Sequence, residues 1–393
     1  MDSPKGIFKK HQAQTFPFPS CLEIESAKGS YIYDVNGKAY LDFVAGVSAN
    51  TLGHSNPIII DAVKQQLDKY SHVMVYGEYL QSPQYKLAKL LAENLPENLS
   101  TSYFVNSGAE AIEGAMKLAK RATGRPEIIS CKDSYHGSTQ GALSIIGNEE
   151  QKEKYKPLLP HCNQIIYNDV SSLANITEKT AAVVIEPVQG GTGFVTPKNN
   201  FLQKVRERCN ETGTLLILDE IQTCFGRLGT LFGFEKYNVI PDILCIAKGM
   251  GGGMPIGAFI SSWELMNLLT FEPKLGHITT FGGHPINCTA SLATLQHLLS
   301  SDIMKEVEQK EQLFRTHLSH PKIKVIRGEG MMLALEFENE DIAQKVVEQS
   351  LEKGLILFYF LFTKTAIRIT PPITLSEEEI IEGCKIIKGI LDV

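Results

Sequence analysis

Two residues of this 393-residue chain stand where chemistry often occurs, each at the end of a short apolar run. Lys248 follows residues 243–247, and Asp219 follows residues 215–218. A lysine at a buried strand end is partly desolvated, which lowers its pKa and makes it a nucleophilic amine. Alternatively, its long stem carries the amine out to water at the sheet edge. An aspartate in such a place is either catalytic or a cap for the next turn.

A third feature is the small turn Asn106-Ser107-Gly108-Ala109-Glu110, between residues 103–105 and a helical pattern. A turn that opens a helix presents free backbone N–H groups to an anion, most often a phosphate. A simpler interpretation is a capping box, in which Ser107 and Glu110 satisfy each other's backbone N–H groups. Glu186 ends a fourth run, residues 181–185, ahead of another turn.

In this order, a phosphate turn, a carboxylate and a lysine are what a pyridoxal phosphate (PLP) enzyme needs. The turn binds the phosphate, the carboxylate keeps the pyridinium nitrogen protonated, and the lysine forms a Schiff base with the aldehyde. A nicotinamide-dependent dehydrogenase is disfavoured, because no strand is followed by Gly-x-Gly-x-x-Gly and the glycines at 251–253 lack that spacing. The sequence therefore predicts PLP as the cofactor.

The elements that must position these residues follow from the apolar pattern. From about residue 100 to 290, runs that are apolar throughout alternate with helical segments, which indicates a largely parallel sheet buried on both faces. Ligands bind beyond the carboxyl ends of such strands, where all four features fall. We expect an N-terminal arm and hairpin over residues 1–44 that packs with the small domain, a large PLP-binding α/β domain over 45–290, and a small C-terminal α+β domain over 291–393. Asn36-Gly37 predicts a type I′ turn in the hairpin.

Composition excludes several classes of function. With 38 basic and 44 acidic residues the net charge is −6, which gives no global attraction to nucleic acid or an anionic membrane. No apolar run reaches the ~18–20 residues that span a bilayer, and the first residues lack a signal-peptide core. Eight scattered cysteines without Cys-x-x-Cys, and ten histidines without metal-binding spacing, predict a cytoplasmic protein with no metal.

The motifs resemble those of the class III aminotransferases, PLP enzymes of fold type I. The resemblance runs from Gly37-Lys38-Ala39-Tyr40-Leu41-Asp42-Phe43 to Arg368-Ile369-Thr370-Pro371-Pro372. It is most specific in Leu218-Asp219-Glu220-Ile221-Gln222-Thr223-Cys224-Phe225-Gly226-Arg227. It implies an α/β fold, with helices flanking a mostly parallel sheet in the large domain and a smaller α+β C-terminal domain.

The resemblance also implies roles around the cofactor ring. Lys248 would carry the cofactor and then move the substrate proton, Asp219 would bind the ring nitrogen, and Gln222 would reach the ring hydroxyl. Ile221 and Tyr135 would pack on the two faces of the ring. Two further residues, His136 and Glu186, are assigned to the cofactor site.

At the phosphate, the resemblance assigns Ser107, Gly108 and Ala109 to the same subunit. Thr280, in Thr279-Thr280-Phe281-Gly282-Gly283, resembles the residue that reaches the phosphate of the neighbouring subunit. That role would make the protein a homodimer with its active sites at the subunit interface. Glu220 is interpreted as a structural carboxylate, and His284 either lines the site or is structural.

The substrate side departs from the resemblance at three positions. Acetylornithine and ornithine aminotransferases carry a carboxylate-binding arginine where this chain has Ser138, and a glutamate that screens the C-terminal arginine where it has Gly191. Val47 stands where ornithine aminotransferases hold a tyrosine. Arg368 remains, and strand alternation places it on the same face as Ala366 and Thr370.

These departures favour a ping-pong transaminase that takes the amino group from an ω-amino acid or amine to a small keto acid such as pyruvate. The alternative within the class is an acetylornithine-, ornithine- or 4-aminobutyrate-type aminotransferase that uses 2-oxoglutarate. A PLP aminomutase or racemase on the same fold is a further alternative. A non-catalytic binding protein is disfavoured, because Asp219, Gln222 and Lys248 are all present.

Overall fold

The computed structural model describes residues 3–393. Its central element is a seven-stranded sheet with the strand order β4-β10-β9-β8-β7-β5-β6. These strands are β4 (Thr101–Val105), β5 (Glu127–Cys131), β6 (Cys162–Ile165), β7 (Thr180–Ile185), β8 (Leu215–Asp219), β9 (Ile243–Ile246) and β10 (Gly257–Ser261). Only β10 runs against its two neighbours, so the predicted, largely parallel sheet is confirmed.

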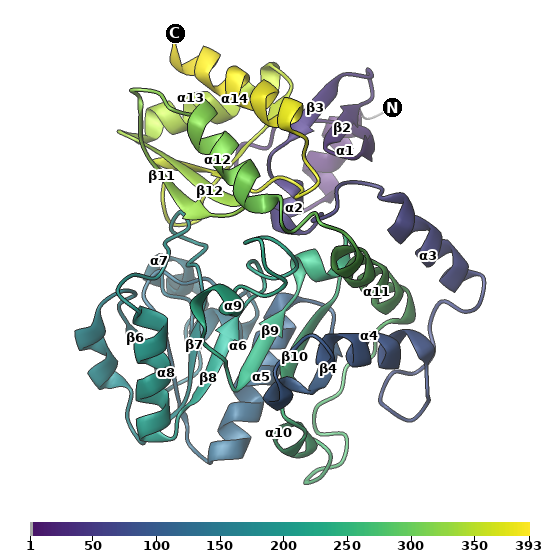
Figure 1. Cartoon of the computed structure of the whole chain (residues 1–393), viewed down its shortest axis with the longest axis vertical. Coiled ribbons are helices and arrows are strands. Elements are labelled where there is room, and N and C mark those ends of the chain that lie inside the picture. Colours follow the sequence, from purple (N-terminus) through teal and green to yellow (C-terminus); the bar gives the residue numbers. More distant parts are fainter. Residues whose placement is uncertain (1–2) are drawn as a thin grey trace.

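Both faces of this sheet are covered by helices, which is why its strands are apolar throughout. Ile217 of β8 packs in the apolar cluster that contains α5 (Gly108–Thr123). Its neighbours Leu216 and Leu218 belong to the cluster of α8 (Phe201–Thr212). Because successive strand side chains point to opposite faces, α5 and α8 lie on opposite sides of the sheet (Figure 1).

Seven further helices of residues 3–393 surround the sheet. They are α3 (Pro57–Leu67), α4 (Ser82–Ala92), α6 (Gln140–Ser144), α7 (Glu149–Lys152), α9 (Phe234–Tyr237), α10 (Trp263–Asn267) and α11 (Pro285–Ser300). Helix α11 packs on α3 and α4. It runs without a break through residue 290, the position at which the change in sequence pattern suggests a domain boundary.

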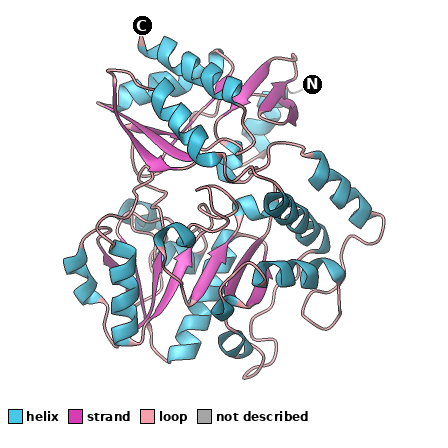
Figure 2. Ribbon diagram, viewed as in Figure 1, coloured by secondary structure: helices cyan, strands magenta, loops and turns pink. Residues whose placement is uncertain are grey.

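A second layer of structure forms the upper part of the molecule in Figures 1 and 2. An antiparallel sheet has the order β11-β12-β15-β14, formed by β11 (Ile323–Glu329), β12 (Met332–Phe337), β14 (Phe358–Tyr359) and β15 (Ala366–Ile369). Three helices accompany it: α12 (Val307–His317), α13 (Glu340–Glu352) and α14 (Glu377–Leu391). Helix α14 begins with a capping box in which Ser376 and Glu379 satisfy each other's backbone N–H groups.

The N-terminal residues join this upper part. After α1 (Pro4–His11), the strands β1 (Ile24–Lys28), β2 (Tyr31–Asp34) and β3 (Ala39–Asp42) form a sheet that β13 (Leu355–Ile356) extends in parallel with β3. A strand of the first 44 residues is thus hydrogen-bonded to one from the C-terminal third.

The hairpin turn between β2 and β3 differs from the predicted type I′. Asp34 N donates to Lys38 O, so the loop has three residues, of which Gly37 has a positive φ of 79° and Asn36 does not. A type I′ turn needs positive φ at both central residues. The Asp34 carboxylate accepts from Asn36 N and Lys38 N, each at 2.9 Å, and this local bonding favours the longer loop.

Within residues 3–393, no helix is long and apolar enough to cross a membrane. The same residues contain no group of three or more histidine, cysteine, aspartate or glutamate side chains that could hold a metal ion.

Candidate active site

A cavity of about 580 Å³ opens at the carboxyl ends of β4, β7, β8 and β9. Its upper wall comes from β14, β15 and the residues that follow β3. Fourteen of the fifteen site residues predicted from the sequence line it: Val47, Ser107, Gly108, Ala109, Tyr135, His136, Ser138, Glu186, Gly191, Asp219, Ile221, Gln222, Lys248 and Arg368. Thr280 does not line this cavity and is exposed. The ends of parallel strands therefore bring residues from distant parts of the sequence to one place.

Asp219 and His136 form a buried pair at the base of the cavity. His136 Nδ1 lies 2.7 Å from Asp219 Oδ2, and the backbone N–H of Ile221 donates to Asp219 Oδ1 at 3.1 Å. Burial alone would lower the pKa of His136, but the hydrogen bond and charge of Asp219 outweigh burial and raise it. The raised pKa favours the protonated imidazole, which donates its Nδ1–H to Asp219.

Glu186, at the end of β7, is a second buried carboxylate of the cavity. Its oxygens accept from the backbone N–H groups of Gly190 at 3.0 Å and Tyr135 at 3.3 Å. Burial raises the pKa of Glu186 to about 7, against the lowering effect of His136. Glu186 thus ties the loop after β5, which carries Tyr135, to the turn after β7, which carries Gly191.

Lys248 follows β9 and begins a short 3₁₀ turn (Lys248–Gly251). It has a positive φ of 46°, an uncommon conformation for a lysine that often marks a functional position. Burial lowers the pKa of Lys248, which Asp219 and Glu186 partly counteract. Among the described residues, no carboxylate lies within ion-pair distance of Lys248, which leaves its amine free for covalent chemistry.

The turn at the start of α5 presents an anion site. Gly108 N and Ala109 N are the first N–H groups of a 16-residue helix, and no acceptor for them lies in residues 3–393. A Cβ on Gly108 would lie 2.7 Å from Ile221 Cδ1, so a larger residue at 108 would push the Ile221 side chain away from this turn. The helix dipole adds positive potential at this place.

The capping box predicted from Ser107 and Glu110 forms in part. Ser107 Oγ accepts from Glu110 N at 3.2 Å, as predicted. The Glu110 carboxylate instead accepts from the backbone N–H of Asn106 at 2.6 Å and from its side-chain Nδ2 at 2.9 Å. Ser107 N is thereby left to the anion site, because the glutamate binds one residue earlier.

Gln222 is positioned by Ser48, a residue that the sequence did not indicate. Its Nε2 donates to Ser48 Oγ at 3.1 Å. Ser48 ends the turn α2 (Ala45–Ser48), in which all four residues have positive φ, between 50° and 69°. A left-handed turn costs roughly 1–2 kcal/mol per non-glycine residue, and the β-branched Val47 in it lines the cavity.

Arg368, on β15, is the cavity's cation on the substrate side. Its Nε donates to Tyr359 O at 3.0 Å, and its guanidinium carbon lies 4.9 Å from the centre of the Phe360 ring. Burial lowers the pKa of Arg368 to about 10. No carboxylate of residues 3–393 forms an ion pair with it. Besides Arg368, the only lysine or arginine among the described lining residues is Lys248.

Gly191 and Ser138, two positions at which the sequence departs from the acetylornithine and ornithine aminotransferases, have well-defined neighbours. A Cβ on Gly191 would lie 2.6 Å from two ring carbons of Phe362, so this aromatic side chain occupies the space that a larger residue at 191 would need. Ser138 Oγ lies 3.2 Å from the hydroxyl of Tyr135. Neither position carries charge.

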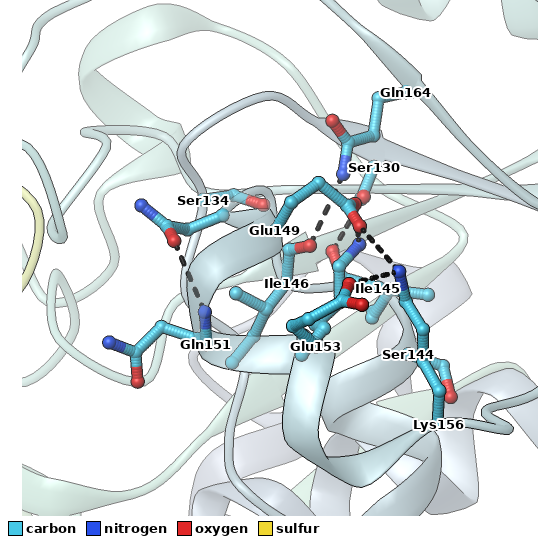
Figure 3. A network of polar contacts seen from close by, with 12 residues as sticks. Ser130, Ser134, Ser144, Ile145, Ile146, Glu149, Gln151, Glu153, Lys156 and Gln164 are labelled. Carbon is cyan, nitrogen blue, oxygen red and sulfur yellow. Dashed lines mark hydrogen bonds and ion pairs between the residues drawn. The ribbon is translucent and has the colours of Figure 1, made fainter.

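The segment after Tyr135 is fixed by the polar network of Figure 3. Ser130 Oγ donates to Ile145 O at 2.6 Å, and Gln164 Nε2 donates to Ile146 O at 3.2 Å. Farther along, Lys156 forms ion pairs with two glutamates. The network joins β5, β6 and the helices between them, so the loop that carries Tyr135 starts and ends on rigid elements.

Two further residues have mainly structural contacts. Glu220 is fully buried and accepts from Gly233 N and Phe234 N at 2.5 Å and from Thr223 Oγ1 at 3.0 Å. His284 caps α11 by accepting from Ile286 N, and its ring stacks on His72. Neither Glu220 nor His284 lines the cavity.

The donors and acceptors of the cavity fit PLP. Free N–H groups at a helix start suit a phosphate, the buried Asp219 suits a protonated ring nitrogen, and the unpaired amine of Lys248 suits an aldehyde. Ile221 and Tyr135 offer an apolar and an aromatic side chain for the faces of a ring.

Comparisons with known proteins agree with this chemistry. A model of the class III aminotransferase family matches residues 13–391. The acetylornithine aminotransferase of Methanopyrus kandleri is 37% identical over 383 residues, which cover 97% of this chain and 96% of that protein. A transaminase structure from the marine bacterium Virgibacillus has a TM-score of 0.91 at 26% identity, with 98% of each chain covered.

A structure of the ornithine aminotransferase from Toxoplasma gondii has a TM-score of 0.90 at 30% identity and covers 98% of this chain and 93% of that chain. It has partial occupancy of PLP at its active site.

Proposed function

This chain belongs to the class III aminotransferases, PLP-dependent enzymes of fold type I, and we propose that it transfers the amino group of an ω-amino acid or simple amine to a small keto acid such as pyruvate. The observation that carries the choice of substrate is that Arg368 is the single unpaired cation on the substrate side of the cavity within residues 3–393. Arg368 can bind one carboxylate, whereas a dicarboxylate such as 2-oxoglutarate calls for a second cation that Ser138 and Gly191 do not supply.

We further propose how the side chains share the work. PLP, when bound, supplies the electron sink for the bonds broken at the substrate carbon. Asp219 holds the proton on the ring nitrogen and is itself held by His136. Gln222 takes the ring hydroxyl, Gly108 N and Ala109 N take the phosphate, and the amine of Lys248 removes and returns the proton of the substrate carbon.

A second candidate is supported by the curated relatives. The protein from Methanopyrus kandleri, and a 38% identical one from Methanocaldococcus jannaschii, are named acetylornithine aminotransferases. In this alternative, acetylornithine is the donor and 2-oxoglutarate the acceptor. Keto acid consumption measured with a panel of donors, each with pyruvate and with 2-oxoglutarate, separates the two. If acetylornithine with 2-oxoglutarate is the best pair by a wide margin, our choice of substrate is wrong.

We expect Arg368→Ala to raise the KM for pyruvate by about 10- to 100-fold, because a bidentate charge-assisted contact is lost. The KM for an uncharged amine donor should change less than threefold, since that donor brings no carboxylate to this place. Steady-state kinetics with each substrate varied in turn measure both values. Arg368→Lys is the matched control and should recover part of the loss, as its charge remains but its planar fork does not. Equal effects on both substrates would contradict the role.

We also propose that the protein acts as a homodimer in which Thr280 completes the phosphate site of the neighbouring subunit. Thr280 is exposed in the single chain, although Thr279 beside it accepts from Asn106 Nδ2 at 3.1 Å. The turn is thus fixed while Thr280 remains free to reach outward.

Thr280→Ala should weaken PLP binding by about 10- to 150-fold, the equivalent of ~1.5–3 kcal/mol for one hydrogen bond to a charged group. Titration of the apoenzyme with PLP measures this, with the exposed Thr270→Ala as the control. Sedimentation at assay concentration should show a dimer. An active monomer would rule out the shared site.

A further inference from the structure

The segment of residues 358–363, Phe358-Tyr359-Phe360-Leu361-Phe362-Thr363, crosses the substrate side of the cavity, and we call it the strap. Two of its side chains, Phe358 and Leu361, line the cavity. They are 44% and 52% exposed, although both are large and apolar. A chain gains little by leaving such side chains in water beside its active site, unless a bound molecule covers them.

The two residues between these side chains, Tyr359 and Phe360, hold the strap in place. Phe360 is buried against Phe194, with the two rings edge to face and their centres 4.8 Å apart. Tyr359 pairs with Ile367 of β15, and its carbonyl accepts from Arg368 Nε. The strap therefore fixes the carboxylate-binding arginine and forms the apolar wall with the same few residues.

The far end of the strap is latched to the turn after β7. Phe362 N donates to Gly191 O at 3.1 Å, and Thr363 Oγ1 donates to Thr192 O at 3.1 Å. The Phe362 ring lies so close to Gly191 that a single added methyl group would meet it at 2.6 Å. A side chain at position 191 would therefore displace the Phe362 ring, so Gly191 and Phe362 act as one latch.

We propose that the strap makes this enzyme selective for amino donors that carry a branched aliphatic or aromatic group beside the carboxylate or amine that the site recognises. Phe358 and Leu361 are the specificity-determining residues, and Phe362 is a positioning residue that keeps them over the cavity. Val47 and Met254, which also line the cavity, extend the apolar surface. This inference rests on the proposed function, because it places the recognised carboxylate at Arg368.

Binding of unreactive carboxylates tests the proposal without relying on turnover. The absorbance of the PLP-loaded enzyme is titrated with propionate, 3-methylbutanoate and glutarate, and a Kd is obtained for each. We expect 3-methylbutanoate to bind about 5- to 15-fold more tightly than propionate, since each buried CH₂ contributes ~0.8 kcal/mol. Equal affinities of these two acids in the wild-type enzyme would overturn the proposal.

Variants of Phe358 and Leu361, which form the apolar wall, then show which residues cause the preference for 3-methylbutanoate. Leu361→Asn and Phe358→Ala should each reduce the ratio of the two Kd values to below threefold. Leu361→Met, which keeps an apolar side chain of similar size, should leave the ratio unchanged. Ile240→Asn, at an exposed apolar residue outside the cavity, should also leave it unchanged. A ratio that survives both wall variants would show that the strap does not select the substrate.

The latch is tested by combining two substitutions. Gly191→Ala should displace Phe362 and lower the ratio, and Phe362→Ala should lower it as well. In the Phe362→Ala background, Gly191→Ala should have no further effect, because the ring it would meet is gone. Independent effects of the two substitutions would contradict a shared latch. Circular dichroism shows that each variant is folded, and the wall variants keep the proposal testable if Gly191→Ala is not.

The glutarate arm separates this inference from the proposed choice of keto acid. Tight glutarate binding, together with an apolar preference that the wall variants abolish, would leave the strap selective and refute pyruvate as the acceptor. Weak glutarate binding with no effect of the wall variants would leave pyruvate as the acceptor and refute the selectivity of the strap. Tight glutarate binding with no effect of the variants would refute both.

Discussion

Lys248→Ala is expected to abolish transamination, with a loss of at least about 10⁴-fold in kcat, while the protein stays folded. The residue has two functions, because its amine holds the cofactor covalently and later moves the substrate proton. Both functions require a neutral amine. Burial lowers the pKa of Lys248, so its neutral form persists to lower pH than that of an exposed lysine.

The same residue should be identified by chemical labelling. Borohydride reduction of the yellow holoenzyme fixes PLP on its lysine, and peptide mapping should find the label at position 248. Lys152 and Lys310 are the natural internal controls, since both are buried lysines that instead pair with glutamates at 2.5 and 2.9 Å. A label on either of them, or full activity of Lys248→Ala, would refute the assignment.

The strand ends were predictable from the sequence because a strand that is buried on both faces is apolar at every position. Runs such as residues 215–218 have no polar position, and each run ends at the residue that meets the cavity. Strand β6 has no such run, because its sequence Cys-Asn-Gln-Ile lies at the sheet edge and mixes polar with apolar residues. An edge strand has fewer neighbours to impose an apolar pattern.

The substrate side was less predictable, since its geometry depends on contacts between distant segments. The Phe362 ring lies over Gly191, and nothing in either local sequence indicates that the two meet. The same holds for Ser48, whose hydroxyl binds Gln222. The left-handed turn Ala45–Ser48 contains a β-branched residue that disfavours positive φ, so local preference points away from the observed conformation.

Asp219 and His136 show how information from the sequence and information from the structure combine. The order of motifs indicates a carboxylate for the ring nitrogen at position 219, but gives no partner for it. The structure places His136, from the loop after β5, 2.7 Å from Asp219 and buries both side chains. The hydrogen bond from His136 fixes the direction of the Asp219 carboxylate and satisfies one of its oxygens, which matters because both side chains are buried.

Asp219→Asn is accordingly expected to retain much of the PLP and to lose at least about 10³-fold in kcat. A neutral amide fills the same space, but it cannot hold a proton on the ring nitrogen, so the ring becomes a poor electron sink. Glu220→Gln is the matched control on the adjacent carboxylate. It should lower the free energy of unfolding, because Glu220 is fully buried and accepts three hydrogen bonds, but it should leave the PLP spectrum unchanged. Near-normal turnover of Asp219→Asn would rule out the role of Asp219.

The pKa of His136 gives a second readout of the Asp219→Asn substitution. The structure predicts the direction in which this pKa changes. In the wild type Asp219 raises this pKa, so the pair stabilises the fold fully below pH ~6.5, the ordinary value, and this contribution is lost as the pH rises through the raised pKa. In Asp219→Asn the charge of Asp219 is gone, and burial, the largest influence and one that lowers the pKa, outweighs the raising effect of Glu186 that remains. Protonation of His136 then costs stability, so the variant should lose stability toward low pH. Nuclear magnetic resonance titration of His136, with denaturant unfolding at several pH values, measures both effects. A His136 pKa that stays raised in Asp219→Asn would show that Asp219 does not hold the proton on this histidine.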